Sequence, residues 1–435
     1  MNRTHDVGLT SWVASAQGHP DFPIQNLPLG IFRRRGQDDA PSAGVAIGNQ
    51  ILDLARSASA LGVPGGAMAE LCREPRLNAL MGSGGERWSV LRSEISGLLA
   101  SDSPLRSRAM KVADQILVPQ AEAELFVPAA IGDYSDFYAS VHHATNVGSM
   151  FRPDNPLLPN YKWVPIGYHG RASSIVVSGT PVRRPWGQIK PPDADHPVYA
   201  ATRALDYEAE MGCFVGPGNE QGETVPLDRA EEHLFGLSLV NDWSARDIQT
   251  WEYQPLGPFL AKSFSTTISP WVVTLEALEP FRVPAYRRPA ADPAPLPYLN
   301  GTRNRASGGI DVTVEVLLGT ARMREAGMSP VQVSQGRLAD LYWTLGQMVT
   351  HHASNGCNLR PGDLFATGTI SGPTRESRGC LLELTWRGAE PLVLPTQEIR
   401  KFLEDGDEVI LRAYCHKPGA VRIGFGECRG IILQG

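Results

Sequence analysis

Short runs in which apolar and polar residues alternate dominate the chain from Leu125 onward, and Gly, Pro and Asn separate them. Alternation with a period of two is typical of a strand with one buried face. The segments that show it are Ser173–Val177, Leu205–Val215, Leu234–Val240, Trp271–Leu275, Ile310–Leu318, Gly379–Trp386 and Glu408–Tyr414. The pattern predicts that most of this part of the chain is β structure.

Apolar residues at helical spacing are rarer in the same region. The clearest case is Ser334–Ala353, whose apolar stripe consists of Leu338, Leu341, Tyr342, Leu345, Met348 and Val349. We expect a helix there, with the terminal His351-His352 pair serving as charge near the helix C-terminus and not as a pair of metal ligands. Between Val283 and Gly309 no period holds and Pro and Arg are frequent, which predicts a surface insertion.

The first 125 residues have a different pattern and predict a separate unit. Gly44–Leu54 indicates two short strands that turn at Gly48-Asn49, and Glu86–Leu99 has the spacing of a helix, followed by a second helical piece at Leu105–Asp114. Residue types that carry chemistry do not cluster here. We therefore expect this unit to support the fold or to close a pocket.

Length and composition bound the class of protein. A chain of 435 residues exceeds what one core usually organises, so two domains are expected. A net charge of −6 argues against nucleic acid as a main partner. No run approaches the roughly 20 apolar residues that cross a bilayer, no signal peptide is evident, and the six scattered cysteines fit reduced thiols. We expect a cytoplasmic protein that binds neither membrane nor nucleic acid.

The stretch Asp136–Gly148 places a carboxylate, a phenol and two adjacent imidazoles within thirteen positions. Its pattern suits either a short strand or a helix. In both cases Asp136, Tyr138 and a histidine can converge on one pocket, as general acid–base chemistry requires. The alternative is a solvated polar turn in which His142 and His143 are surface residues.

Acidic residues recur in two later segments. Glu208 and Glu210 stand two positions apart and point to one face if the segment is a strand, and Asp242 follows the apolar run Leu234–Val240. Together with Asp136 they offer oxygen ligands only, a set that favours Ca²⁺ or Mg²⁺ over zinc. An exposed polar strand face is the alternative.

A predicted helix after Asp242 supplies anion-binding groups. With Ser244 as its N-cap, Arg246, Gln249 and Tyr253 fall on one face. Guanidinium, amide and phenol groups suit an anion better than a core, although a solvated helix face remains the alternative. Lys262 lies in an otherwise apolar or small run, where a lysine either extends to the surface or pairs with carboxylates.

Several long motifs in fixed order resemble the fumarylacetoacetate hydrolase superfamily, and they cover most of residues 125–435. They are Gly132-Asp-Tyr-Ser-Asp-Phe-Tyr, His143-Ala-Thr-Asn-Val-Gly, Gly167-Tyr-His-Gly-Arg-Ala-Ser-Ser, Asn241-Asp-Trp-Ser-Ala-Arg-Asp, Gly257-Pro-Phe-Leu-Ala-Lys-Ser-Phe, His351-His-Ala-Ser-Asn-Gly-Cys-Asn-Leu-Arg-Pro-Gly-Asp and Gly368-Thr-Ile-Ser-Gly. The resemblance implies a mostly β fold, with a small SH3-like N-terminal β domain at 1–125 and a larger mixed β-sandwich roll with a few helices at 126–435. It also implies a homodimer.

The same resemblance implies an activity and a set of residues. The activity is metal-dependent hydrolysis of the carbon–carbon bond of 4-fumarylacetoacetate to fumarate and acetoacetate, the last step of tyrosine and phenylalanine breakdown. By motif position, Mg²⁺ and/or Ca²⁺ would be bound by Asp136, Glu208, Glu210 and Asp242, with Lys262 and Thr266 beside it. His143 would activate water, and Glu383, on a predicted strand, would orient His143. The oxyanion would be held by Arg246, Gln249 and Lys262. The substrate contacts would be Tyr138, Arg152, Tyr168, Gln249, Tyr253 and Thr369.

Two other functions compete with this one. A relative in the superfamily could hydrolyse an acylpyruvate, or isomerise or decarboxylate a 2-oxo acid. A binding protein could keep the fold without turnover. The long N-terminal unit and the set Arg152, Tyr168 and Tyr253 favour fumarylacetoacetate, and the presence of His143 and Glu383 argues for an enzyme.

Overall fold

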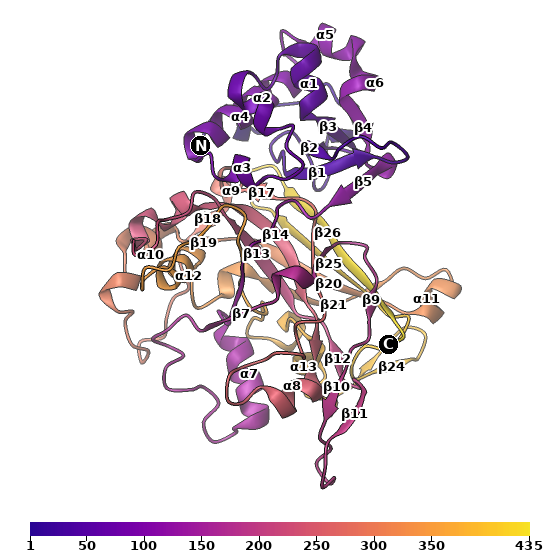
Figure 1. Cartoon of the computed structure of the whole chain (residues 1–435), viewed down its shortest axis with the longest axis vertical. Coiled ribbons are helices and arrows are strands. Elements are labelled where there is room, and N and C mark those ends of the chain that lie inside the picture. The colour runs from indigo at the N-terminus through magenta and orange to yellow at the C-terminus, as the bar shows by residue number, and fades with distance from the viewer.

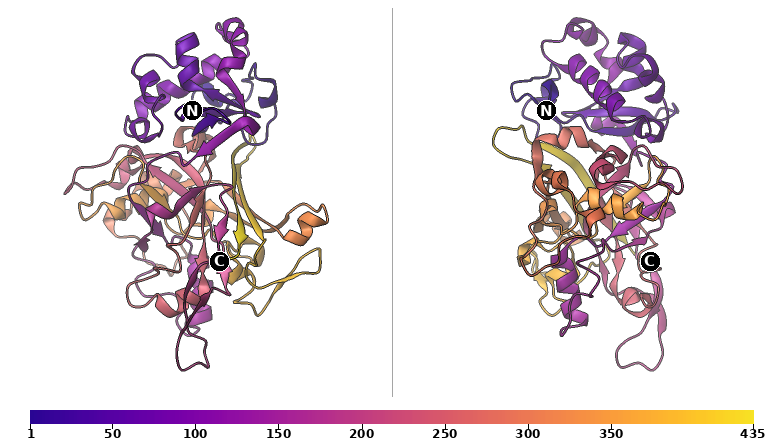
Figure 2. Two further views of the ribbon diagram at one scale, coloured as in Figure 1. Left: turned by 45° about the vertical axis from the view of Figure 1, so that its right-hand side comes forward. Right: turned by 90° about the vertical axis from the view of Figure 1, so that its left-hand side faces the viewer.

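The structure is a computed structural model that describes residues 1–435, and it consists of two stacked units (Figure 1). The smaller unit is formed by the N-terminal part of the chain and lies at one end of the long axis. The larger unit contains the rest, and both further views show the same division (Figure 2). No helix is both long and apolar enough to span a membrane.

The N-terminal unit is an antiparallel five-stranded sheet with helices against it, in the order β4-β3-β2-β1-β5. Its strands are β1 (Leu29–Arg34), β2 (Ser42–Ile47), β3 (Gln50–Asp53), β4 (Leu117–Pro119) and β5 (Ala123–Phe126). Its helices are α1 (Leu54–Leu61), α2 (Gly66–Leu71), α3 (Asn78–Met81), α4 (Gly85–Leu99), α5 (Arg106–Lys111) and α6 (Ala113–Ile116).

These elements confirm the hairpin expected around Gly48-Asn49, where Ile47 pairs with Gln50, and the helix expected at Glu86–Leu99. The second helical piece is present but breaks at Val112 into α5 and α6. With six helices the unit is not a β domain alone. Its SH3-like character and the division at residue 125 stay predictions; β5, the last strand of this sheet, ends at Phe126.

The larger unit is built on two sheets. The first has the order β7-β6-β22-β13-β14-β16-β8, with β17 beside β14, and the second has the order β21-β20-β25-β26-β9. The strands of the first sheet are β6 (Tyr134–Phe137), β7 (Gly167–His169), β8 (Ile175–Val177), β13 (Ala209–Val215), β14 (Leu234–Asp242), β16 (Thr266–Ile268), β17 (Val273–Thr274) and β22 (Leu364–Ala366). Those of the second are β9 (Val182–Arg183), β20 (Thr313–Gly319), β21 (Val331–Arg337), β25 (Glu408–Cys415) and β26 (Ile423–Leu433).

Two-stranded pairs and seven short helices complete the larger unit. The pairs are β10 (Trp186–Ile189) with β11 (Val198–Ala201), β12 (Leu205–Asp206) with β15 (Ser244–Ala245), β18 (Arg282–Val283) with β19 (Gly309–Ile310), and β23 (Leu392–Val393) with β24 (Ile399–Arg400). The helices are α7 (Val141–Phe151), α8 (Arg246–Glu252), α9 (Leu275–Leu278), α10 (Thr302–Ser307), α11 (Ala321–Glu325), α12 (Leu345–His352) and α13 (Leu381–Leu384).

A single core joins the two sheets. It contains 50 buried residues, among them Met211 and Leu237 from the first sheet and Val316, Leu411 and Phe425 from the second. The strands β13 and β14 are buried along their whole length, because the N-terminal unit covers their other side. Side chains at the ends of these strands are therefore held in a dry and rigid setting.

Three expectations about elements need correction. Gly379–Trp386 was expected to be a strand, but the segment forms the one-turn helix α13. In Ser334–Ala353 only the last part is helical, since the residues up to Arg337 belong to β21, which pairs with β20. The fold also has thirteen α-helices where a few were expected, although it remains mostly β.

Candidate active site

A cavity of about 620 Å³ opens at one end of the first sheet. Most of the residues predicted to act on substrate, water or metal line it: Asp136, Tyr138, His143, Arg152, Tyr168, Glu208, Arg246, Gln249, Tyr253, Lys262 and Thr369. The remaining predicted residues, Glu210, Asp242, Thr266 and Glu383, lie directly behind this lining and contact its members. The structure therefore brings the whole predicted set together around one cavity.

Neighbouring strands carry the four carboxylates to the same end of the sheet. Asp136 of β6 lies opposite Ala366 of β22, which lies opposite Gly212 of β13. Glu208 directly precedes β13, Glu210 is its second residue, and Asp242 is the last residue of β14. The ligand oxygens of the four carboxylates lie within 4.8 Å of one another. Sheet register thus creates the cluster that the sequence could only suggest.

Two buried cations balance part of this charge. The Lys262 ammonium lies 2.7 Å from Asp242 Oδ2 and 2.9 Å from Glu208 Oε2. The Arg246 guanidinium lies 2.5 Å from Glu208 Oε1 and 2.9 Å from Asp206 Oδ2. Burial acts to raise the pKa of Glu208, yet Lys262 and Arg246 hold that pKa well below its usual range. Lys262 is therefore paired with carboxylates and does not extend to the surface.

Asp136 and Glu210 have no such cation. Burial, with the neighbouring carboxylates adding to it, raises the pKa of each well above its usual range. Asp136 Oδ1 and Glu210 Oε1 are buried and accept no hydrogen bond. Unpaired buried oxygens in an all-oxygen donor set fit a hard divalent cation. The four carboxylates can hold such an ion, and Thr266 supports the site by donating to Asp242 Oδ1 at 2.9 Å.

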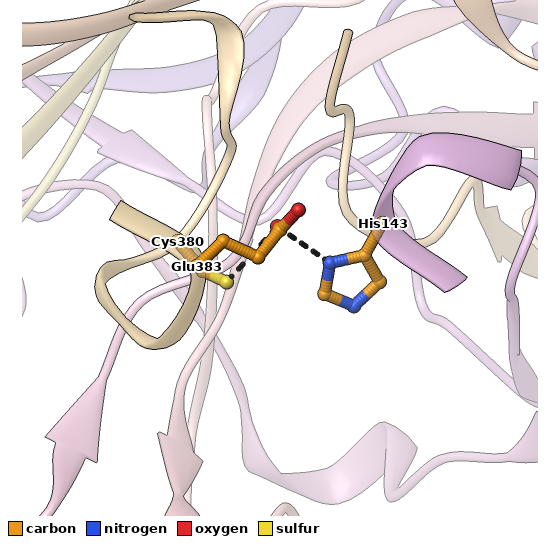
Figure 3. A group of neighbouring side chains, drawn as sticks. All are labelled: His143, Cys380 and Glu383. Carbon is orange, nitrogen blue, oxygen red and sulfur yellow. Dashed lines mark hydrogen bonds and ion pairs between the residues drawn. The ribbon is translucent and has the colours of Figure 1, made fainter. Parts of the chain in front are cut away.

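His143 forms the second chemical centre of the cavity. It lies in the first turn of α7, which begins directly after the loop that follows β6, and Ser140 caps this helix by accepting from the His143 N–H. The imidazole Nδ1 lies 2.6 Å from Glu383 Oε2, and Nε2 lies on the opposite edge of the ring (Figure 3). Asp136–Gly148 is thus strand at its start and helix from Val141. His142 lies outside the cavity, with its ring 6.3 Å from that of Tyr286.

Glu383 is fully buried on α13 and not on a strand, which corrects the expectation for its setting. Burial acts against its ionisation, but the charge of His143 and hydrogen bonds from His143, Asn146 and Ser371 lower the pKa of Glu383 to about 2. Asp206 holds the start of α13, because its carboxylate accepts the N–H groups of Leu381 and Leu382 at 2.8 and 2.9 Å. Glu383 is therefore an anion aimed at one imidazole nitrogen.

Helix α8 presents its polar face to the cavity, as the spacing of Arg246, Gln249 and Tyr253 predicts. The expected N-cap is wrong: α8 begins at Arg246, and Ser244 belongs to β15, where its hydroxyl donates to Glu208 Oε1 at 3.2 Å. One nitrogen of Arg246, Nη2, is buried without a partner. A donor is thus free to bind an anion in the cavity.

The predicted substrate contacts lie on several walls. Tyr138 directly follows β6, and Tyr168 lies in the middle of β7 opposite Asp136 and donates to Asp242 Oδ2 at 3.0 Å. Thr369 has a buried hydroxyl without a partner, while Arg152 is exposed at the end of α7. These positions place polar groups both deep in the cavity and at its mouth.

The motifs did not single out every residue that matters here. Arg387 lines the cavity, with its guanidinium 4.8 Å from the Phe151 ring, and Leu382 and Phe402 add apolar wall. Asn146 was part of the histidine motif but had no role assigned. No periodic or motif signal marks Arg387, since it enters the cavity through a left-handed turn after α13, at φ 56°.

A buried acid–base pair and an all-oxygen cation cluster that meet in one cavity are typical of an enzyme that activates water beside a hard divalent cation. Comparison with known proteins gives the family. The family model described as "Fumarylacetoacetate (FAA) hydrolase C-terminal" matches residues 134–432, and the one described as "Fumarylacetoacetase N-terminal" matches residues 25–128. This chain belongs to the fumarylacetoacetate hydrolase family.

Curated relatives match over nearly the full length. Fumarylacetoacetase of Homo sapiens is 50% identical over 415 residues, covering 95% of this chain and 96% of the relative. Fumarylacetoacetase of Caenorhabditis elegans is 49% identical over 428 residues, covering 98% and 99%. Among solved structures, the fumarylacetoacetate hydrolase from psychrophilic Exiguobacterium antarcticum has a TM-score of 0.51 at 17% identity, covering 94% of this chain and 100% of that one. The last likeness concerns the fold alone.

Proposed function

We propose that this chain catalyses the metal-dependent hydrolysis of 4-fumarylacetoacetate to fumarate and acetoacetate, the last step of tyrosine and phenylalanine catabolism. The observation that carries the proposal is the His143–Glu383 pair, 2.6 Å between Nδ1 and Oε2, beside a four-carboxylate cluster at the same cavity. Full-length relatives named fumarylacetoacetase, at 49 to 50% identity, support the choice of substrate.

His143 is the general base in this proposal. When Nδ1–H donates to the Glu383 carboxylate, the tautomer is fixed and Nε2 carries the lone pair. With this lone pair unshared, Nε2 can take a proton from water. The resulting hydroxide attacks one carbonyl carbon of the diketone. Collapse of the tetrahedral intermediate then breaks the carbon–carbon bond between this carbon and the CH₂ group, whose electron pair leaves with the enolate. The proton on Nε2 later passes to the carbon of the leaving enolate, which returns His143 to its starting state.

The tetrahedral oxyanion needs donors that are already in place. Arg246 offers its unpaired Nη2, and Gln249 lies one turn further along α8 beside it. Lys262 adds a fixed positive charge at the same wall. Each such donor typically contributes about 10²–10³ in rate.

Asp136, Glu208, Glu210 and Asp242 would hold Mg²⁺ and/or Ca²⁺, with Lys262 and Thr266 beside it. The ion, when bound, supplies Lewis acidity toward the diketone oxygens and stabilises the enolate that leaves. The carboxylates keep the ion at the sheet end, and Lys262 limits the net negative charge that they create.

The substrate carries a carboxylate at each end, and cations at the mouth suit one of them. Arg152 and Arg387 both line the cavity from its exposed side. The Thr369 hydroxyl lies deeper, and Tyr138, Tyr168 and Tyr253 would hold the carbon chain between the ends. Guanidinium groups bind carboxylates through paired hydrogen bonds, which fixes the orientation of the substrate.

A direct assay tests this function. Fumarylacetoacetate is added in the presence of Mg²⁺ or Ca²⁺, and loss of the diketone absorbance is followed before and after chelation. We expect turnover that chelation abolishes and added metal restores. Absence of turnover, with turnover of an acylpyruvate instead, would favour the competing superfamily reaction.

We further propose that the chain acts as a homodimer in the cytoplasm. The hairpin of β10 and β11 projects from the end of the molecule opposite the N-terminal unit (Figure 2) and exposes Trp186 and Tyr199. Trp251 of α8 lies beside this hairpin, and its Nε1–H donates a hydrogen bond to Gln188 Oε1 at 3.2 Å. All six cysteines are free, which supports a reducing compartment. Light scattering should give twice the chain mass, and the charge introduced by Tyr199→Glu should lower it to one chain.

A further inference from the structure

The Glu383 carboxylate accepts hydrogen bonds from four side chains, of which the proposed reaction uses only His143. Ser371 Oγ donates to Oε2 at 2.7 Å, and Cys380 Sγ lies 3.2 Å from the same oxygen. Asn146 Nδ2 donates to the other oxygen, Oε1, at 2.8 Å. Both oxygens of this fully buried carboxylate thus accept hydrogen bonds, one at Oε1 and three at Oε2.

Asn146 differs from the other donors in the oxygen that it holds. His143, Ser371 and Cys380 all lie at Oε2, so Asn146 is the one side-chain donor at Oε1. The bond from Asn146 to Oε1 gives the carboxylate plane a second point of attachment and helps to keep Oε2 directed at Nδ1. His143 and Asn146 are three residues apart on α7 and therefore share one face of the helix. One helix face binds both oxygens of one carboxylate.

A closed ring of hydrogen bonds holds this arrangement to the rest of the site. Ser140, the N-cap of α7, donates its hydroxyl to the Ser371 carbonyl at 2.8 Å. Ser371 in turn donates its own hydroxyl to Glu383. Glu383 also accepts hydrogen bonds from His143 and Asn146, which both lie on α7 and so close the ring. The helix that carries the base and the helix that carries its carboxylate are therefore connected directly, through His143 and Asn146, and indirectly, through Ser140 and Ser371.

His143, Cys380 and Glu383 are also close enough to be considered as three ligands of a metal (Figure 3). The contacts argue against this. The Cys380 thiol lies in hydrogen-bond distance of Glu383 Oε2, and burial raises the pKa of Cys380 well above its usual range, so the sulfur keeps its proton. A protonated thiol is a donor to a carboxylate and a poor metal ligand.

We propose that Asn146 is a positioning residue of the reaction, which sets the plane of the Glu383 carboxylate and through it the tautomer and orientation of His143. Ser371 and Cys380 complete the cage around the same carboxylate. The inference rests on the proposed function, because it concerns the base of that reaction. Asn146 acts through Glu383 and touches neither the substrate nor the metal carboxylates.

The variants Asn146→Ala and Asn146→Asp test this role. Ala removes the donor, and Asp keeps the size of the side chain but places a second carboxylate against Glu383. We expect Asn146→Ala to lower kcat about 10- to 100-fold with KM within twofold, the range typical for partners that orient a functional side chain. Asn146→Asp should be slower still. A residue that merely fills space would tolerate Asp better than Ala, so that order would overturn the proposal.

Two further measurements separate positioning from general damage. Ser149→Ala, on the same helix with its hydroxyl on the Thr145 carbonyl, is the matched control and should keep kcat within twofold. Asn146→Ala should add nothing to the loss already caused by Glu383→Gln, whereas full additivity would contradict the proposal. Asn146 is only half-buried, so Asn146→Ala should keep the thermal midpoint of the wild type. Failure of the wild type to turn over fumarylacetoacetate would refute the proposed function instead.

Discussion

Glu208 and Glu210 stand two residues apart, yet the structure gives them opposite protonation behaviour. Glu208 faces two cations within 3 Å and is held ionised. Glu210 accepts one hydrogen bond, from the Gly368 N–H at 3.1 Å, and burial, with the neighbouring carboxylates adding to it, raises the pKa of Glu210. The difference shows that the cluster is charge-balanced on one side only. A divalent cation would supply the balance on the other side.

The His143→Ala variant should lose at least about 10³-fold in kcat, because general base catalysis of this kind contributes about 10²–10⁴-fold. The side chain is buried beside the cavity and is not one of the four carboxylates of the cluster, so metal binding and folding should persist. Stopped assays measure kcat, and calorimetry measures the binding of Mg²⁺. A variant with near-normal kcat would refute the role of His143.

Glu383 gives a prediction for stability against pH. Its pKa is depressed from 4.5 to about 2 in the folded protein, so its contribution is fully present above pH 4.5 and is lost as the pH falls toward 2. Between pH 6 and pH 3.5 the free energy of unfolding of the wild type should therefore fall by about 1 kcal/mol relative to that of Glu383→Gln. Urea unfolding of both proteins at the two pH values measures this difference. A constant difference would show that Glu383 is not held as an anion.

At the scale of residues, the sequence identified the side chains that sit in long motifs, and the structure brings all of them to one cavity. It did not identify Arg387 or a role for Asn146. The role of Asn146 depends on α13 arriving beside α7 from more than 230 residues away. No local pattern encodes such a meeting.

Helix α13 shows the same limit at the scale of elements. The run Leu381-Leu-Glu-Leu-Thr-Trp reads as a strand, since its apolar content and length suit one. Its first N–H groups are instead bound by the Asp206 carboxylate, a cap supplied by a distant part of the chain. The strand β20 was predictable because its period-two burial is a local signal, whereas a single turn fixed by a tertiary cap is not.

The last turn of α7 also depends on a tertiary contact, the close approach of Gly148 to Pro156, and this contact can be tested. A Cβ on Gly148 would lie 1.9 Å from the Pro156 carbonyl oxygen, so Gly148→Ala must displace the segment that follows α7 and carries Arg152. We expect a lower thermal midpoint and a higher KM for fumarylacetoacetate. Gly97→Ala on α4, where a Cβ meets nothing within 4 Å, is the control and should stabilise the protein by up to about 1 kcal/mol. Equal behaviour of the two variants would contradict the close approach.

At the scale of the molecule, the two units share a core. Leu29 and Val272 exchange backbone hydrogen bonds at 3.0 and 2.7 Å across the boundary. A cluster of 33 buried residues combines Leu91 and Ile95 of α4 with Phe235 and Ile268 of the larger unit. Thermal unfolding by calorimetry should therefore show one transition for both units, and Phe235→Ala should lower that transition as a whole. Two separate transitions would show that the units unfold independently.

The carboxylate cluster links the stability of the whole molecule to metal. Four buried carboxylates, two of them with an unpaired oxygen, cost free energy without a cation, and binding to the folded state alone adds about 2.7 kcal/mol when the metal is at 100 times its Kd. Glu210→Gln removes one potential charge and leaves the neighbours in place. After chelation the variant should unfold at the temperature of the wild type or above it, because the raised pKa of Glu210 already disfavours its charge. With Mg²⁺ or Ca²⁺ added, the wild type should gain several degrees and the variant little. Scanning calorimetry with and without metal compares them, and an undiminished gain in the variant would exclude Glu210 from the cation site.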